Sequence, residues 1–485
     1  MGAGTKANAG DDSENPSFRK ESEPQHDYSE NIDPIATLAN EPCRVVDVRF
    51  EGARRTKPTI LAKVVSDVFK SSSLQDCLIR SVQIRDNLKS LEAFSDVNIQ
   101  IENIDQDKGD AYRVTFKVEE RGRIAASANA SVDNHSNKLT NFDLILPNLT
   151  GNCDCIKLSS KANTLGFISG KRLNSHEFLY TVPIRPWRAL FNPVYSLSYG
   201  RNQYGAQPSG YDLEERSIAN KVDFYSSPNT HHSISWDNIW RFIKTSSVNI
   251  PIEIREQSGH SVKSALKHTV TWDNRVYRGN FPSGGINVEL SNEFPVTQIK
   301  DFARFTKHEA SLQINARLPS YDVLGQMSLT AGAMGINRAA KYDICDKYFP
   351  GGPLTMRGFE HQGLGPNIRG HPIGVLSYFT AGLHLYPKLP YTTPGMFFYK
   401  SLRPHLFVNM GTVGDLNLLR KPGNFEDVKK EAHRFSDSMR YSAGIGLAMH
   451  AWGLRWEINY CIPIISKESD MTRTGLQWGF GFRYS

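Results

Sequence analysis

The chain has 485 residues, a mean hydropathy of −0.43 and a net charge of +7. It is too long for one small domain, and it contains no run of the roughly 18 apolar residues that a membrane-spanning helix requires. Six cysteines without a CxxC pair exclude a disulfide framework and a zinc pattern. Low hydropathy still permits a membrane barrel, whose strands need only about 9 to 11 residues, half of them facing a polar lumen.

The first segment of the chain is acidic. Residues 1–40 carry three basic and eight acidic side chains, so this segment is about −5 and the remainder about +12. We predict that residues 1–42 form a disordered acidic arm. The arm lacks the pattern of a secretory signal and is too acidic for a transit peptide, which disfavours bacterial secretion to an outer membrane.

Residues 43–120 are expected to form one compact β-α-α-β-β unit. Apolar and charged residues alternate over 46–51, which is the period of a half-buried strand. A helix is expected from Pro58, with an apolar stripe that extends to residue 69. A second helix is expected to begin at Ser73, with Asp76 completing a variant of the capping box. Two further alternating strands are expected over residues 97–101 and 112–118.

From residue 121 onward, the helical period gives way to segments of about ten residues with a period of two. In Met439–His450 one side of the predicted strand is apolar and the other is polar, and the same division recurs along this region. Charged residues on the polar side are tolerable only if that side is wet. We predict a mainly β protein, with an antiparallel transmembrane β-barrel of about 16 strands over residues 121–485 and a small α+β domain before it.

A soluble antiparallel β protein would show the same alternation and is the main alternative. Two features weigh against it. About 360 residues never return to a helical period, and tryptophans lie at segment ends, as in the aromatic girdles of membrane barrels. These tryptophans are Trp240, Trp272, Trp452 and Trp456.

The sequence shows no constellation of enzyme residues. It lacks a P-loop, HExxH, GxSxG and a GxGxxG that opens a helix. We therefore expect no enzymatic activity, no cofactor, no metal and no nucleic-acid partner. Cys153 and Cys155 are expected to share one face of a strand as small wall residues.

One long connection, residues 341–373, interrupts the barrel strands. It is too long for a tight hairpin, and such loops usually fold inward or bind something. Its candidate latch residues are Gly351, Gly352, Arg357, Gly358 and Phe359.

The tip of this loop suits an internal latch. The guanidinium of Arg357 can bind a lumenal carboxylate through two hydrogen bonds, Gly358 permits close backbone approach, and Phe359 can anchor the tip in the wall. Glu457 faces the lumen by its pattern, but nothing in the sequence selects it over other inward acids.

Five strands follow the loop, and the last of them covers residues 476–484. Aromatic residues face one way along it, whereas Gln477 and two glycines face the other. The glycines should loosen and twist the strand, which would weaken its pairing with the first strand. The candidate seam residues are Gln477, Gly479, Phe480, Gly481 and Phe482.

These motifs resemble those of one superfamily. A Gly-Gly pair followed by Met356-Arg357-Gly358-Phe359, five strands before the C-terminus, resembles the loop motif of the outer-membrane β-barrel insertases that carry POTRA domains. The last strand resembles their C-terminal β-signal. Within this superfamily, the chain from residue 43 onward is similar to the core-subunit family of the mitochondrial sorting and assembly machinery. The segments that carry this likeness include Arg255–Ser264, Tyr348–Pro353 and Ala381–Tyr386.

The resemblance implies a location, a function and partners. Residues 43–120 would be a POTRA domain that lies with the N-terminus in the intermembrane space, and the barrel would be a multi-pass protein of the mitochondrial outer membrane. It would insert β-barrel precursors through a lateral seam between its first and last strands, without nucleotide. Implied partners are the precursors, metaxin-like subunits of the machinery, an inner-membrane organising complex and the lipid bilayer. The alternatives are a passive outer-membrane pore or a docking platform with a POTRA interaction module.

Overall fold

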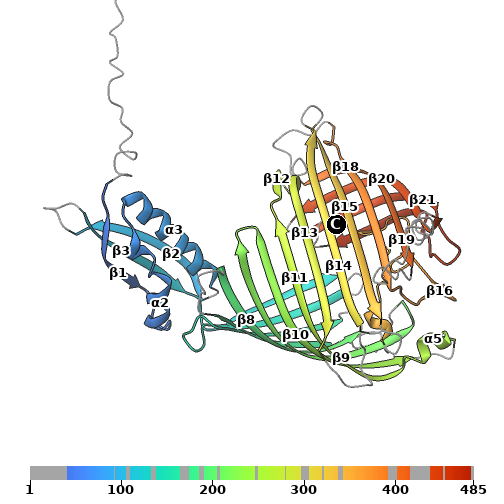
Figure 1. Cartoon of the computed structure of the whole chain (residues 1–485), viewed down its shortest axis with the longest axis horizontal. Coiled ribbons are helices and arrows are strands. Elements are labelled where there is room, and N and C mark those ends of the chain that lie inside the picture. Colours follow the sequence, from blue (N-terminus) through green and yellow to red (C-terminus); the bar gives the residue numbers. More distant parts are fainter. Residues whose placement is uncertain are drawn as a thin grey trace, which may run out of the picture.

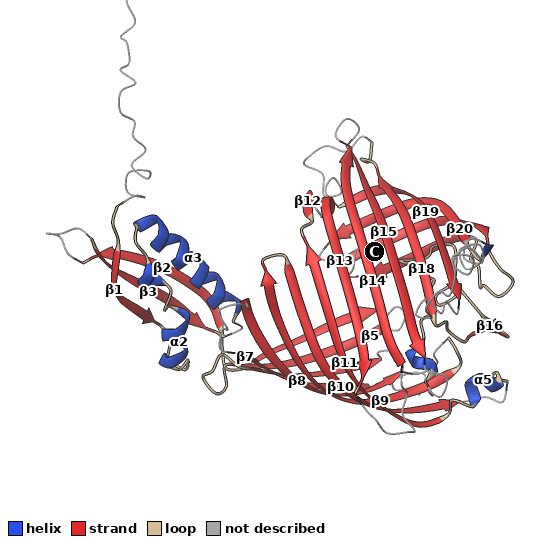
Figure 2. Cartoon of the chain, in the orientation of Figure 1, coloured by secondary structure: helices blue, strands red, loops and turns tan. Residues whose placement is uncertain are grey.

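In the computed structural model, a small α+β unit precedes one large antiparallel sheet that curves into a barrel (Figure 1). Helices gather in the α+β unit, whereas the rest of the regular structure is almost entirely strand (Figure 2). The predicted acidic arm lies outside the described residues, apart from its last two positions. The structure describes residues 41–91, 93–104, 110–132, 138–163, 174–184, 191–204, 208–245, 249–278, 280–296, 305–318, 322–336, 342–390, 401–414, 437–451 and 454–481.

The α+β unit has the predicted β-α-α-β-β order. Its central strand β3 pairs parallel with β1 and antiparallel with β2. Its elements are β1 (Arg44–Glu51), α2 (Pro58–Val64), the 3-10 turn η1 (Val68–Lys70), α3 (Leu74–Ser90), β2 (Phe94–Asn103) and β3 (Ala111–Glu120).

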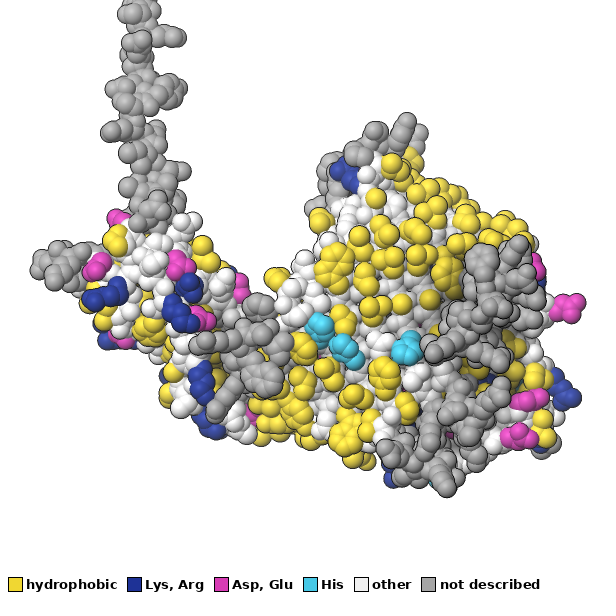
Figure 3. All heavy atoms as spheres, in the orientation of Figure 1, with side chains coloured by type: hydrophobic (Ala, Val, Ile, Leu, Met, Phe, Trp, Pro, Cys, Tyr) yellow, Lys and Arg dark blue, Asp and Glu magenta, His cyan; other side chains and the backbone are white. Residues whose placement is uncertain are grey.

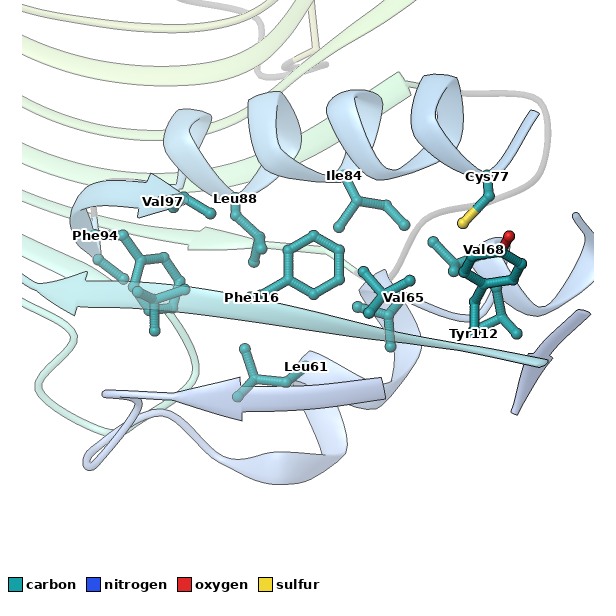
Figure 4. Close-up of a cluster of buried hydrophobic side chains, with 14 of the residues drawn as sticks. Leu61, Val65, Val68, Cys77, Ile84, Leu88, Phe94, Val97, Tyr112 and Phe116 are labelled. Atoms are coloured by element: carbon teal, nitrogen blue, oxygen red, sulfur yellow. The ribbon is translucent and has the colours of Figure 1, made fainter. Parts of the chain in front are cut away.

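The helices of this unit cover one face of its sheet, and their apolar side chains meet those of the strands (Figure 4). Phe116 of β3 lies at the centre of this core and is fully buried, as is Leu88 of α3. Helix α3 begins as predicted, because Ser73 accepts a hydrogen bond from the Asp76 backbone N–H at 3.2 Å. The first helix is shorter than predicted and ends at Val64. The helix ends there because the β-branched Val64 and Val65 are followed by Ser66 and an aspartate, which are all weak helix formers.

In the described part of the chain, sixteen long strands form the large sheet, as predicted. They are β4 (Ala125–Val132), β5 (Lys138–Pro147), β6 (Cys155–Asn163), β7 (Asn174–Pro183), β8 (Phe191–Tyr204), β9 (Tyr211–Ser227), β10 (Thr230–Thr245), β11 (Gly259–Asp273), β13 (Phe281–Pro295), β14 (Phe305–Leu318), β15 (Val323–Ile336), β18 (Ser377–Tyr386), β19 (Leu402–Gly414), β20 (Arg440–Ala451), β21 (Leu454–Ile465) and β22 (Gly475–Gly481). A three-residue strand, β12 (Val276–Arg278), pairs with β13, and β16 (Asn367–Ile368) pairs with β17 (His371–Pro372).

The strand order closes the sheet as a barrel, with the last strand β22 next to the first strand β4. Among the described residues, a residue-by-residue register joins every pair of neighbouring long strands except this one. The junction of β22 and β4 is therefore the place where the sheet is least continuous.

The barrel strands expose their apolar side chains and bury their polar ones. On β21, Ile458 is 59% exposed, whereas its neighbours Glu457 and Asn459 are each 1% exposed. Hydrophobic side chains accordingly spread over the outer wall in Figure 3. A soluble fold would bury the apolar face, so this inversion argues against the soluble alternative and fits a wall that faces lipid.

Among the described residues, short helical turns correct the expectation that helix is absent after residue 121. The turn α5 (Ile252–Arg255) lies between β10 and β11, and the 3-10 turn η3 (Ile344–Asp346) lies at the start of the long loop. Ile254 and Ile344 are both buried in one cluster with Tyr211 and Ile243, so packing stabilises turns that are too short to show a period. No helix among the described residues is long and apolar enough to cross a membrane.

The expectation that Cys153 and Cys155 share one face of a strand is wrong. Strand β6 begins at Cys155, whereas Cys153 lies in the preceding turn with a φ of 57°. Its side chain is buried in the core of the α+β unit. The turn forms because the Asp154 carboxylate accepts hydrogen bonds from Thr150 N at 3.0 Å and Thr150 Oγ1 at 2.8 Å.

This β5–β6 turn therefore joins the barrel to the α+β unit. Asn148 donates to Thr56 Oγ1 at 2.8 Å, and Thr56 Oγ1 donates in turn to the carboxylate of Glu120 at 2.7 Å. The Lys57 backbone N–H donates to Gly151 O at 2.9 Å. Because β5 pairs directly with β4, these contacts connect the α+β unit to the first strands of the barrel.

Candidate functional site

The long loop between β15 and β18 folds into the barrel and pairs with other backbone along its length. Tyr348 forms a bridge with Val375 at the base of the loop, and Phe359 forms one with Thr472, which precedes β22. The described part of the loop spans residues 342–376, so residue 341 of the predicted segment lies outside it. These bridges fix the loop at its base and at its tip.

At the tip, Arg357 binds Glu457 of β21 through two hydrogen bonds. Nε donates to Oε2 at 2.8 Å and Nη2 donates to Oε1 at 3.1 Å. Both side chains are fully buried. A bidentate pair of this kind combines strength with a defined geometry. The structure thus selects Glu457 from the inward acids that the sequence left open.

Glu457 has further partners on its own strand. Arg455 donates to Oε1, and Asn459 Nδ2 donates to Oε2 at 2.9 Å. Arg455 also donates to the hydroxyl of Tyr386 at 2.7 Å. Because Arg455 remains beside it, Glu457 would keep one cationic partner if Arg357 were removed.

Gly358 allows the tip to approach the wall closely. It has a φ of 86°, and an added Cβ would lie 3.1 Å from Ser442 Cβ on β20. Ser442 Oγ also donates to the backbone oxygen of Arg357. Phe359 is fully buried and packs with Met356 and Leu364 of the loop. The predicted anchoring aromatic therefore packs largely within the loop itself.

The two predicted sites, the loop tip and the last strand, form one site. Gln477 of β22 accepts a hydrogen bond from Gly358 N at 3.0 Å and donates to Phe359 O at 2.8 Å. At Gly479, an added Cβ would lie 2.9 Å from Pro353 Cβ of the loop. The absence of a side chain there lets the loop lie against the inner face of β22.

The remaining predicted residues lie nearby. Gly351 and Gly352 have φ values of 112° and 124°, which favour glycine. The backbone of Phe480 pairs with Trp456, and that of Gly481 pairs with Arg455. Phe482 lies outside the described residues.

Sequence reasoning missed several residues of this site. Asp470, just before β22, accepts hydrogen bonds from Gly365 N at 2.9 Å and from Arg440 Nε at 2.9 Å. Ser442 was also missed, although its inward position on a strand that alternates clearly was a usable signal. Asp470 lies in a connecting loop, where no period indicates the direction of a side chain. Among the residues that the structure describes, no group of three or more His, Cys, Asp or Glu side chains could hold a metal ion.

The family is decided by a match over most of the chain. Residues 125–484 match the model of the Omp85 superfamily domain. The chain belongs to the Omp85 superfamily. It is homologous to the sorting and assembly machinery component 50 homolog of Homo sapiens, with 29% identity over 92% of each chain. The corresponding Xenopus laevis homolog A is 28% identical over 92% of each chain.

A solved structure shows the same fold. BamA from Haemophilus ducreyi lacking POTRA domains 1–3 superposes with a TM-score of 0.68 at 16% sequence identity. The match covers 90% of this chain and 84% of that chain. This Omp85 chain therefore shares the BamA fold, and its apolar outer wall fits a barrel that faces lipid.

Proposed function

We propose that this Omp85 chain inserts and assembles β-barrel precursor proteins in the mitochondrial outer membrane. The observation that carries the proposal is the attachment of the loop tip to the last strand by Gln477. A barrel that served only as a wall would not need its loop fixed to β22, the strand beside the least continuous junction. The likeness to sorting and assembly machinery component 50 supports both the proposed function and the proposed location in the mitochondrial outer membrane.

The proposed mechanism is opening of a lateral seam between β22 and β4. Unpaired backbone N–H and C=O groups cannot remain bare in hydrocarbon, because each costs several kcal/mol. A precursor strand that pairs with an opened edge satisfies these groups by β-augmentation. Backbone pairing then supplies both recognition and driving force, and no nucleotide is used.

The glycines of the last strand support this mechanism. Gly479 and Gly481 should loosen and twist β22, which would shorten its pairing with β4. Short hydrophobic elements are accommodated by local thinning of the bilayer. A thinner membrane beside the seam would lower the barrier to entry of a precursor strand.

The α+β unit is proposed to be a POTRA domain in the intermembrane space, with the N-terminus on the same side. The β5–β6 turn that contacts this unit connects it to strands next to the seam. Metaxin-like subunits and an inner-membrane organising complex are proposed as partners on the basis of family resemblance alone.

Depletion of the protein, followed by import of a labelled barrel precursor into isolated mitochondria, tests the function. Carbonate-resistant, protease-protected assembly of the precursor should fail, while helical outer-membrane proteins still insert. Normal assembly of barrels after depletion would contradict the proposal. A constitutive conductance that disappears in the same depleted membranes would then favour the passive pore.

A further inference from the structure

The inward loop is attached to the barrel at a second place, at its base. Asp346 ends the 3-10 turn η3, and its side chain is 1% exposed. Arg241 Nη1 of β10 donates to its Oδ1 at 2.9 Å, and Lys263 Nζ of β11 donates to the same atom at 3.0 Å. Lys307 Nζ of β14 donates to the backbone oxygen of Asp346 at 2.9 Å. Three cations of the wall therefore converge on one loop residue.

The cations are themselves held in place by the wall. Arg241 Nε donates to Glu215 of β9 at 2.9 Å, and Lys263 pairs with Glu293 of β13. Burial alone would raise the pKa of the Asp346 carboxyl, but Lys263 and Arg241 outweigh burial and lower that pKa. The base of the loop is thus a buried, ionised anchor in a socket of wall cations.

The two anchors lie on opposite sides of the barrel. Strands β10 and β11 are half-way round the strand order from β21 and β22. Residues 347–356 therefore connect two anchors that lie far apart in the strand order. Attachment at both ends restricts where the tip can lie.

The charges of the two anchors are reversed. At the base the loop supplies an anion to cations of the wall, whereas at the tip Arg357 supplies a cation to Glu457. A loop docked in the reverse sense would bring Asp346 against Glu457 and Arg357 against Arg241. Like charges in a buried site are strongly unfavourable, so this arrangement permits one orientation of the loop.

We propose that Asp346 is a positioning residue for the loop tip: its socket of Arg241, Lys263 and Lys307 fixes the base of the loop so that Gly358 meets Gln477 on the last strand. The role of the tip in insertion rests on the function proposed above, but the positioning itself does not. It can be measured without any precursor.

Hydrogen exchange of the full-length barrel in detergent tests the positioning. In Asp346→Asn, exchange over residues 356–360 should rise by about tenfold or more, because the tip opens without unfolding of the barrel. In Asp346→Glu, which keeps the charge, the rise should be much smaller. Asp143→Asn is the matched control: it removes a lumen-facing acid that pairs with Lys157 at 3.3 Å, away from the loop.

A second variant, in the barrel wall, tests the same contact if Asp346→Asn does not fold. Arg241→Gln weakens the same socket from β10 and should raise exchange over residues 356–360 in the same way. Unchanged tip exchange in folded Asp346→Asn and Arg241→Gln barrels overturns the proposal, whatever their insertion activity. Raised tip exchange with normal precursor assembly supports the positioning role and instead removes the tip from the proposed insertion mechanism.

Discussion

The Gly358 backbone N–H donates to the side-chain oxygen of Gln477 at 3.0 Å, and the same side chain donates to the next carbonyl of the loop at 2.8 Å. One residue of the last strand thus satisfies the backbone donor of Gly358 and the backbone acceptor of Phe359. Buried peptide groups without partners are costly. The loop tip and β22 are therefore expected to move together.

Gln477→Ala should release the tip from β22. Loss of both hydrogen bonds leaves two buried peptide groups unsatisfied, at about 1–3 kcal/mol each. We expect faster hydrogen exchange at residues 356–360 and reduced precursor assembly. Gln326→Ala is the control, because this buried glutamine of β15 has no hydrogen-bond partner among the described residues. Equal effects of the two substitutions would show that the loss is general.

Arg357→Ala should leave a folded barrel in the membrane but impair precursor insertion. Removing one partner of a buried ion pair typically lowers the free energy of unfolding by ~3–5 kcal/mol. Because Arg455 still pairs with Glu457, the loss of stability should lie near or below that range. Arg357→Lys should be intermediate, since an ammonium cannot form the two-bond contact.

Assembly of imported precursors and carbonate resistance of the variant are the measurements. Arg317→Ala, which removes a pair with Asp322, is the control. Normal assembly by Arg357→Ala excludes a role for the tip.

Gly479→Ala should disturb the packing of the loop on β22. The new Cβ would lie 2.9 Å from Pro353 Cβ, on a rigid ring that cannot turn away. Overpacking of this kind typically costs about 1–3 kcal/mol. Gly284→Ala is the matched control, because nothing lies within 4 Å of an added Cβ there. Thermal stability of the purified barrels should fall for Gly479→Ala only, and equal melting of the two would contradict the packing argument.

The contact between the α+β unit and the barrel should weaken in acid. Burial alone would raise the pKa of Glu120, but hydrogen bonds from Thr56 and from the Arg55 backbone outweigh it and lower that pKa. The contribution of Glu120 to stability is therefore complete above the ordinary carboxyl pKa, about 4.3, and is lost as the pH falls toward the lowered folded value.

Hydrogen exchange between about pH 6 and about pH 3 can monitor unfolding of the α+β unit. It measures how the stability contributed by Glu120 depends on pH. Glu120→Gln should be less stable at the upper end and should lose less stability on acidification. Glu119→Gln, an exposed neighbour, should behave like the parent chain. An unchanged pH profile for Glu120→Gln would contradict the assigned role.

The period of the side chains predicted most of the fold. Alternation along strands such as β20 and β21 follows from one wet and one apolar face, so it located these strands and their inward residues. Helix α3 was predicted because its cap, Ser73 with Asp76, is a local signal. The single-turn helices could not be found, since one turn has no period and depends on packing.

The site was predicted in parts and not as a whole. The loop motif identified Arg357, and alternation directed Glu457 inward, but their pairing joins residues 100 positions apart. Local patterns contain no information on which inward acid lies opposite the tip. The contact of Gln477 with Gly358, the socket around Asp346 and the insertion of Cys153 into the α+β core likewise depend on tertiary packing.

The most direct test of the seam is a disulfide between β22 and β4. Gly479 is unsuitable because it lies against Pro353, whereas Trp478 and Ala128 are exposed on the outer wall. Trp478→Cys combined with Ala128→Cys, and with Ala126→Cys to sample the register, should block precursor insertion when oxidised and restore it when reduced. The control pair, Trp478→Cys with Ile458→Cys, links directly paired positions of β22 and β21 and should permit insertion. Undiminished insertion with the β22–β4 bond intact would contradict lateral opening.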